Sequence, residues 1–142
     1  MAFQYIVVPY DGSQNAERAL EQAVQLADGL QATLDVVYVD PTQSQLLEQQ
    51  LAIPTHELDA YFAEEEQDVK DRLKALTSSA HPSRVTVLQG HAGKEIVRYA
   101  ADVHADLIII GSRGLGTLQE WMLGSVSHYV AQHAPCAVTI VK

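Results

Sequence analysis

Two short glycine-containing segments hold the residues whose chemistry is easiest to interpret. Gly-Ser-Arg-Gly at 111–114 directly follows the apolar run 107–110, and Gly-Ser at 124–125 comes after nine further residues. The apolar run is typical of a buried strand, so the first glycine marks its exit into a loop. Glycine lets a backbone approach a ligand closely, and peptide N–H groups there can point at an anion. A helix predicted over 125–133 adds unpaired N–H groups at its start, so the pattern predicts a phosphate-binding loop.

A second polar segment follows the first apolar run of the chain. Residues 3–8 predict a strand that Pro9 stops, and Asp-Gly-Ser at 11–13 predicts a turn with helix-capping chemistry. The carboxylate of Asp11 only accepts hydrogen bonds and can take two donors. It can therefore stabilise the turn, accept from the hydroxyls of a ligand, or do both.

The elements that must position these residues alternate along the chain. Apolar periodicity and turn residues predict strands at 3–8, 33–39, 85–88, 107–110 and 137–141, and helices at about 16–30, 57–78, 94–104 and 125–133. This alternation predicts one α/β domain over residues 1–142, with a five-stranded parallel sheet covered by helices on both faces. With the strand order 3-2-1-4-5, the loops after the first and fourth strands face one crevice, where such sheets bind ligands. Residues 42–56 predict no clear element.

The two polar segments together resemble the universal stress protein family. The resemblance rests on Val-Pro-Tyr-Asp-Gly-Ser at 8–13 and on the spacing G-x2-G-x9-G-S from residue 111 to residue 125, and it covers essentially the whole chain. The glycine spacing is similar to that of the ATP-binding branch of the family. The resemblance implies a Rossmann-like fold, bound ATP with Mg²⁺ held through the phosphates, and a homodimer.

The resemblance also implies a role for individual residues. Asp11 is expected to accept hydrogen bonds from the ribose, and the backbone of Val39 to contact the adenine edge. The glycines and the start of the helix at 125 are expected to hold the phosphates, while Arg113 either pairs with a phosphate or points to solvent. The predicted binding residues are Pro9, Asp11, Val39, Gly111, Arg113, Gly114, Gly124, Ser125, Val126 and Ser127.

Composition argues against several classes of partner. Eighteen acidic and nine basic side chains give a net charge of −9, which repels nucleic acids and acidic membrane surfaces. No apolar run approaches the roughly 20 residues of a membrane helix, and the first residues lack the features of a signal peptide. A single cysteine allows no internal disulfide. We therefore expect a cytoplasmic protein.

The last predicted strand, 137–141, indicates how copies of the chain associate. It is apolar and lies at the edge of the predicted sheet, and exposed edges tend to be covered or paired. A twofold partner strand would cover it, which agrees with the homodimer that the resemblance implies.

The function predicted from these observations is an ATP-binding sensor or regulator in the stress response, whose nucleotide state tunes its interaction with a protein partner of unknown identity. No catalytic residue or metal ligand is predicted, so slow ATP hydrolysis or autophosphorylation is the most that we expect. A nucleotide-free dimeric scaffold stays open as an alternative. A phosphoacceptor domain is less favoured, because the third predicted strand ends in Leu-Gln-Gly at 88–90 without a carboxylate.

Overall fold

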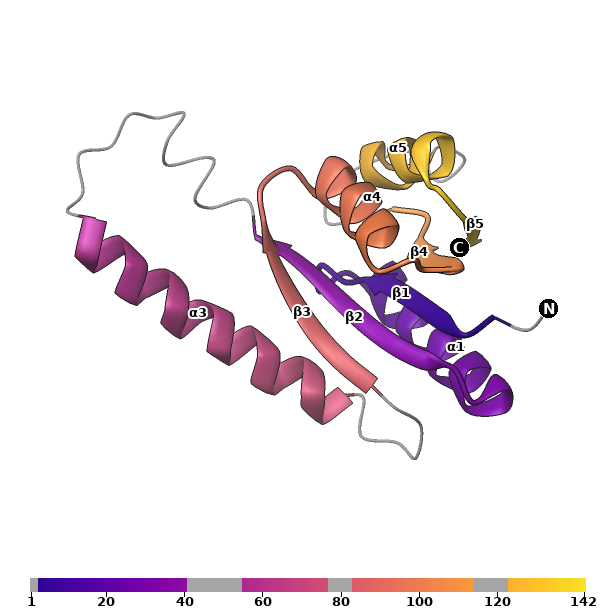
Figure 1. Ribbon diagram of the computed structural model, residues 1–142, viewed down its shortest axis with the longest axis horizontal. Coiled ribbons are helices and arrows are strands. Elements are labelled where there is room, and N and C mark those ends of the chain that lie inside the picture. The colour runs from indigo at the N-terminus through magenta and orange to yellow at the C-terminus, as the bar shows by residue number, and fades with distance from the viewer. Residues whose placement is uncertain (1–2, 41–54, 77–82, 114–122) are drawn as a thin grey trace.

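A computed structural model of the chain describes residues 3–40, 55–76, 83–113 and 123–142 (Figure 1). Its five strands form one parallel sheet in the order β3-β2-β1-β4-β5, which confirms the predicted order. The strands are β1 (Tyr5–Pro9), β2 (Thr33–Asp40), β3 (Ser83–Gln89), β4 (Leu107–Gly111) and β5 (Ala137–Val141).

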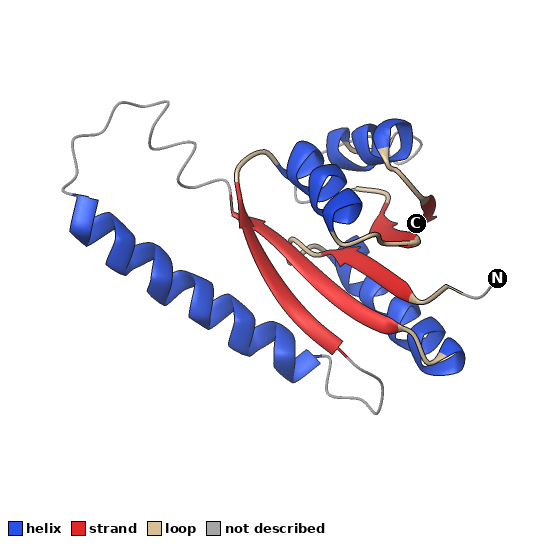
Figure 2. Cartoon of the chain, viewed as in Figure 1, coloured by secondary structure: helices blue, strands red, loops and turns tan. Residues whose placement is uncertain are grey.

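Helices cover both faces of the sheet (Figure 2). The helices are α1 (Gln14–Leu30), α3 (Thr55–Leu76), α4 (Ala92–Asp102) and α5 (Ser125–His133). Side chains of β2 alternate between two cores: Leu34 and Val36 pack with α1 and with Leu73 of α3, whereas Val37 packs with α4 and α5. This two-layer burial is the expected consequence of a parallel sheet whose crossover helices lie on opposite faces. No helix of the described residues is long and apolar enough to span a bilayer.

Several elements extend beyond their predicted bounds for local reasons. Helix α1 begins two residues early, because the Ser13 side chain accepts a hydrogen bond from the Ala16 N–H at 3.1 Å and caps the helix. Strand β3 continues through polar residues, since its ladder with β2 runs from Ser83 to Gln89. Gly90 then ends the strand with a φ of +130°, a conformation that favours glycine.

Gly111, at the end of β4, lets α1 lie directly against the sheet. A Cβ atom on Gly111 would come within 2.8 Å of the carbonyl carbon of Asn15 in the first turn of α1. Backbone cannot yield as a flexible side chain can, so a larger residue would push the helix away from β4. The glycine is therefore required by helix packing, a reason that its spacing in the sequence did not indicate.

Strands β1 and β4 separate toward their carboxyl ends. Their register contains only Ile6 opposite Leu107 and Val7 opposite Ile108. By contrast, β1 stays paired with β2 as far as Pro9, and β4 stays paired with β5 as far as Gly111. The winding of the sheet reverses between β1 and β4, so a crevice opens where the two strands part.

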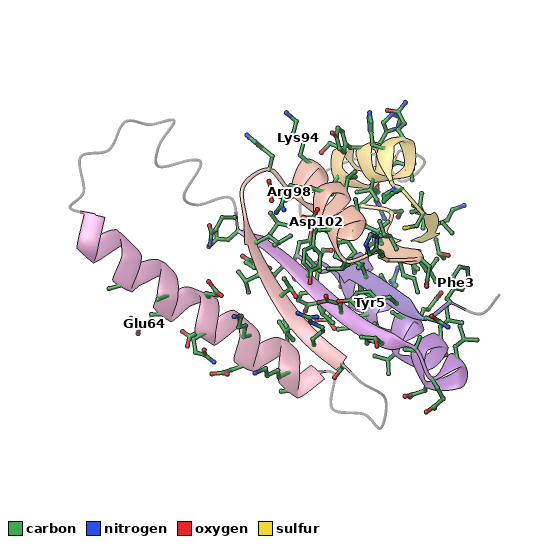
Figure 3. All side chains as sticks on the ribbon, in the orientation of Figure 1. Phe3, Tyr5, Glu64, Lys94, Arg98 and Asp102 are labelled. Atoms are coloured by element: carbon green, nitrogen blue, oxygen red, sulfur yellow. The ribbon has the colours of Figure 1, made fainter. Side chains whose placement is uncertain are left out.

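One carboxylate is fully buried in the other half of the sheet. Asp35 of β2 accepts hydrogen bonds from the hydroxyls of Tyr5 (2.7 Å), Tyr99 (2.7 Å) and Thr86 (2.9 Å), and the Arg84 Nε lies 3.8 Å from it. Burial is the main cause that raises the pKa of both tyrosines, and the neighbouring carboxylate raises it further. The cluster joins β1, β2, β3 and α4; Tyr5 is labelled in Figure 3.

Candidate functional site

A cavity of about 380 Å³ lies where β1 and β4 separate. Its volume falls within the range of roughly 300–1,000 Å³ that is usual for small-molecule sites. Nine of the ten predicted residues line it: Pro9, Asp11, Val39, Gly111, Arg113, Gly124, Ser125, Val126 and Ser127. The tenth, Gly114, lies outside the described residues.

Three helices begin at this cavity. Ser13 and Ala16 at the start of α1, Ala92 at the start of α4, and the first turn of α5 all contribute to its lining. The convergence follows from the topology, because each crossover helix starts where a parallel strand ends. The N-terminal end of a helix carries a partial positive charge, so the cavity favours anions even though the protein is acidic overall.

The first turn of α5 holds open hydrogen-bond donors. Gly124, its N-cap, provides no side-chain cap, and the first turn contains no acidic residue. The N–H groups of Ser125, Val126 and Ser127 meet no acceptor among the residues that the structure describes. Gly124 has an ordinary extended conformation (φ −66°, ψ 161°), so its backbone dihedrals do not require glycine. The available donors are thus backbone amides, as an anion site needs.

The Ser127 hydroxyl is already engaged by the protein. It lies 2.8 Å from the carbonyl oxygen of Ser112 and 3.0 Å from that of Gly124, in a side chain that is only 2 % exposed. A serine hydroxyl donates a single proton, so these two acceptors occupy it. In this arrangement the N–H of Ser127, rather than its hydroxyl, is open to a ligand.

Asp11 combines a structural contact with an open acceptor. Its Oδ1 accepts from the Ser13 N–H at 2.9 Å, which stabilises the turn between β1 and α1. The cap of α1 is Ser13, not Asp11. The Oδ2 of Asp11 meets no donor among the described residues, and the side chain is exposed at the cavity. The turn and a ligand can therefore use different oxygens of one carboxylate.

The charges around the cavity are few and opposite in sign. Asp11 and Arg113 are the only charged side chains among its described lining residues. No histidine is among them, and no group of three or more His, Cys, Asp and Glu in the described ranges is arranged to hold a metal. Attraction for a phosphate must therefore come from Arg113, from the helix starts and from any cation that the ligand brings.

Sequence reasoning missed seven residues of the lining: Tyr10, Ser13, Ala16, Val37, Ala92, Ile96 and Ile110. Most add apolar surface. Val37 lies two positions before Val39 on the same face of β2, so strand alternation was a usable signal for it. Ala92 and Ile96 lie one turn apart on α4, and only the tertiary packing of that helix places them here.

A family model, curated relatives and solved structures all point to one protein family. The model of the Universal stress protein family matches residues 2–142. Over 150 aligned residues the chain is 33 % identical to Universal stress protein YxiE of Bacillus subtilis, with 99 % of each chain covered. Among solved structures, it resembles the universal stress protein UspA from Lactobacillus plantarum (28 % identity, TM-score 0.75, 100 % and 99 % of the chains covered). It also resembles a universal stress protein crystallised in complex with cAMP (29 % identity, TM-score 0.66, 100 % and 98 % covered).

Proposed function

The chain belongs to the universal stress protein family, and we propose from this that it binds ATP in the cavity between β1 and β4, with Mg²⁺ held through the phosphates. The observation that carries the proposal is the meeting of Asp11, Val39 and the open N–H groups of α5 in one cavity. The carboxylate suits a sugar, and the amides suit phosphates. The nucleotide state would then alter the interaction of this cytoplasmic regulator with a protein partner.

The strand order suggests how the nucleotide lies. Val39 belongs to β2, Asp11 follows β1, and the α5 amides lie beside the end of β4. Because β2, β1 and β4 are neighbours in that order, the apolar surface, the carboxylate and the amide donors are arranged in the same order across the sheet. We place the base against Val37, Val39 and Ile96, which form an apolar wall. The ribose then lies at the Oδ2 of Asp11, and the phosphates lie near Gly111, Arg113 and the first turn of α5. Gly114 is expected to extend this phosphate loop on the basis of the sequence alone.

Support for the ligand class comes from a similar protein. The universal stress protein that was crystallised with cAMP is 29 % identical to this chain, with 100 % of this chain and 98 % of that chain covered. Its ligand is an adenine nucleotide, which agrees with an apolar base site next to a phosphate site. Since Asp11 is the only carboxylate in the described lining and no histidine accompanies it, we expect ATP to be bound rather than rapidly hydrolysed.

Titration calorimetry with ATP and Mg²⁺ tests the proposal. The wild-type protein is expected to bind, and Asp11→Asn to bind about tenfold more weakly, because hydrogen bonds to a charged acceptor contribute about 1.5–3 kcal/mol. The amide oxygen of asparagine can still accept from Ser13, so the turn survives. Asp28→Asn, on an exposed part of α1, is the matched control. Absence of ATP binding by the wild type, with no adenine nucleotide released when the purified protein is denatured, would favour the nucleotide-free scaffold.

We also propose that two copies pair through β5. This strand is the last of the sheet, and its outer edge meets no strand within the described residues. Ala137 and Thr139 are exposed on it, whereas Val138 and Ile140 are half-buried. A twofold axis beside β5 would place the same edge of two copies against each other and extend both sheets.

Light scattering after size-exclusion chromatography should report twice the chain mass of 15.5 kDa. Thr139→Lys should shift the protein toward the monomer, because like charges from two copies would meet near the axis. Gln132→Lys, an exposed position on α5, adds the same charge elsewhere and should leave the dimer intact. A wild-type protein that stays monomeric at high concentration contradicts this arrangement.

A further inference from the structure

The backbone of Ser112 connects the candidate phosphate site to the edge strand. Ser112 directly follows β4 and is buried. Its N–H donates to the carbonyl oxygen of Val141, the last residue of β5, at 2.7 Å. Its own carbonyl oxygen accepts from the Gly124 N–H at 2.7 Å and from the Ser127 hydroxyl at 2.8 Å. One residue thus bonds to the end of β5 on one side and to the start of α5 on the other.

The side chain of Ser127 adds a second bond between Ser112 and the first turn of α5. Its hydroxyl spans the Ser112 and Gly124 carbonyls, so it joins two segments that are 12 residues apart in the chain. The Gly124 carbonyl also accepts the first bond of the helix, from the His128 N–H at 2.9 Å. A movement of the first turn would therefore strain or break contacts to Ser112. Without the hydroxyl, the Gly124 N–H would be the one hydrogen bond left between Ser112 and the described residues of the turn.

We propose that Ser127 is a positioning residue that couples phosphate occupancy at α5 to the pairing of β5 with β4, through the backbone of Ser112. The inference rests on the proposed function, since it requires a phosphate at the first turn of α5. A bound phosphate would accept hydrogen bonds from the N–H groups of that turn and so fix its position. The turn in turn donates to the Ser112 carbonyl, and the Ser112 N–H donates to the carbonyl of Val141 at the end of β5. The nucleotide therefore acts on the strand through which two copies are expected to pair.

Residue-resolved amide hydrogen exchange, with and without ATP and Mg²⁺, tests this coupling. An opening that releases the ligand is suppressed by the factor 1 + [L]/Kd, so at 100 times the Kd the Ser112 amide should exchange up to about 100-fold more slowly. In Ser127→Ala this protection of Ser112 should fall below about threefold, because the turn and the strand then open separately. Measurements at equal saturation remove the effect of a changed affinity.

Two further variants separate positioning from direct contact. His128→Ala removes an exposed side chain of α5 that does not line the cavity, and it keeps the backbone N–H that donates to Gly124, so Ser112 should stay protected by ATP. Ser127→Thr keeps a hydroxyl and should restore most of the protection in a folded protein. In the ligand-free state, Ser127→Ala alone should speed exchange of the Gly124 amide, whose acceptor is Ser112.

The outcomes are distinct. If calorimetry shows ATP binding but Ser112 is protected equally in wild type and Ser127→Ala, the coupling is overturned and the proposed function stands. If the wild type binds no ATP, the proposed function is overturned and the coupling to phosphate falls with it. Loss of protection in Ser127→Ala together with its return in Ser127→Thr supports the inference.

Discussion

Ser125→Pro is expected to weaken ATP binding about 10- to 150-fold while α5 stays in place, since hydrogen bonds to charged groups contribute about 1.5–3 kcal/mol. Ser125 is the first residue of α5, where proline is well tolerated because the N–H has no partner within the helix. The residue before a proline must be extended, and Gly124 already has φ −66° and ψ 161°. The substitution therefore removes one amide donor from the cavity at little structural cost.

The matched control is Ser125→Ala, which removes the hydroxyl and keeps the N–H. The difference in affinity between the two variants isolates the contribution of the backbone amide. Thermal unfolding of Ser125→Pro should stay close to that of the wild type. If both variants bind ATP as the wild type does, the first turn of α5 does not hold the phosphates.

Asp35→Ala is expected to lower the free energy of unfolding by about 3–5 kcal/mol, as when one partner of a buried charge network is removed. The carboxylate is fully buried, and three hydroxyls donate to it, from Tyr5, Thr86 and Tyr99. Removal of the acceptor leaves the half-buried Tyr5 hydroxyl without its partner, whereas the hydroxyls of Thr86 and Tyr99, which lie 3.1 Å apart, can still pair with each other. Urea unfolding followed by circular dichroism measures the loss.

Glu21→Ala is the control for this experiment. Glu21 is exposed in the middle of α1, so its removal should change stability by no more than about 0.5 kcal/mol. An equal effect of the two substitutions would contradict the structural role of the cluster. Asp35 precedes Val37, the nearest cavity-lining residue of β2, by two residues, or about 7 Å along the strand, but Asp35 itself does not line the cavity. ATP affinity of folded Asp35→Ala should therefore change far less than its stability.

The two largest effects thus belong to different parts of the sheet. The buried carboxylate ties α4 to three strands, with contacts that reach the middle of β3, and the open amides of α5 lie where β4 ends. This separation is typical of parallel α/β sheets, in which ligand sites occupy the carboxyl ends of strands.

Local pattern was sufficient to predict most of the fold. Runs such as 107–110 are apolar because a central parallel strand is buried on both faces, and α1 repeats small apolar residues because one of its faces is buried. The predicted sheet order is confirmed, and nine predicted binding residues line one cavity. Their contact with a nucleotide stays a prediction.

By itself, the sequence determined the alternation of strands and helices, the family and the position of the glycines along the chain. Only the tertiary structure decided what individual polar and small residues contact: Gly111 meets α1, the Ser127 hydroxyl meets Ser112, and Asp35 meets two distant tyrosines. The physical reason is the separation along the chain of the residues that interact. Periodicity arises from neighbours a few residues apart, whereas hydrogen-bond partners such as Asp35 and Tyr99 are separated by 64 residues and meet only through strand register and helix packing.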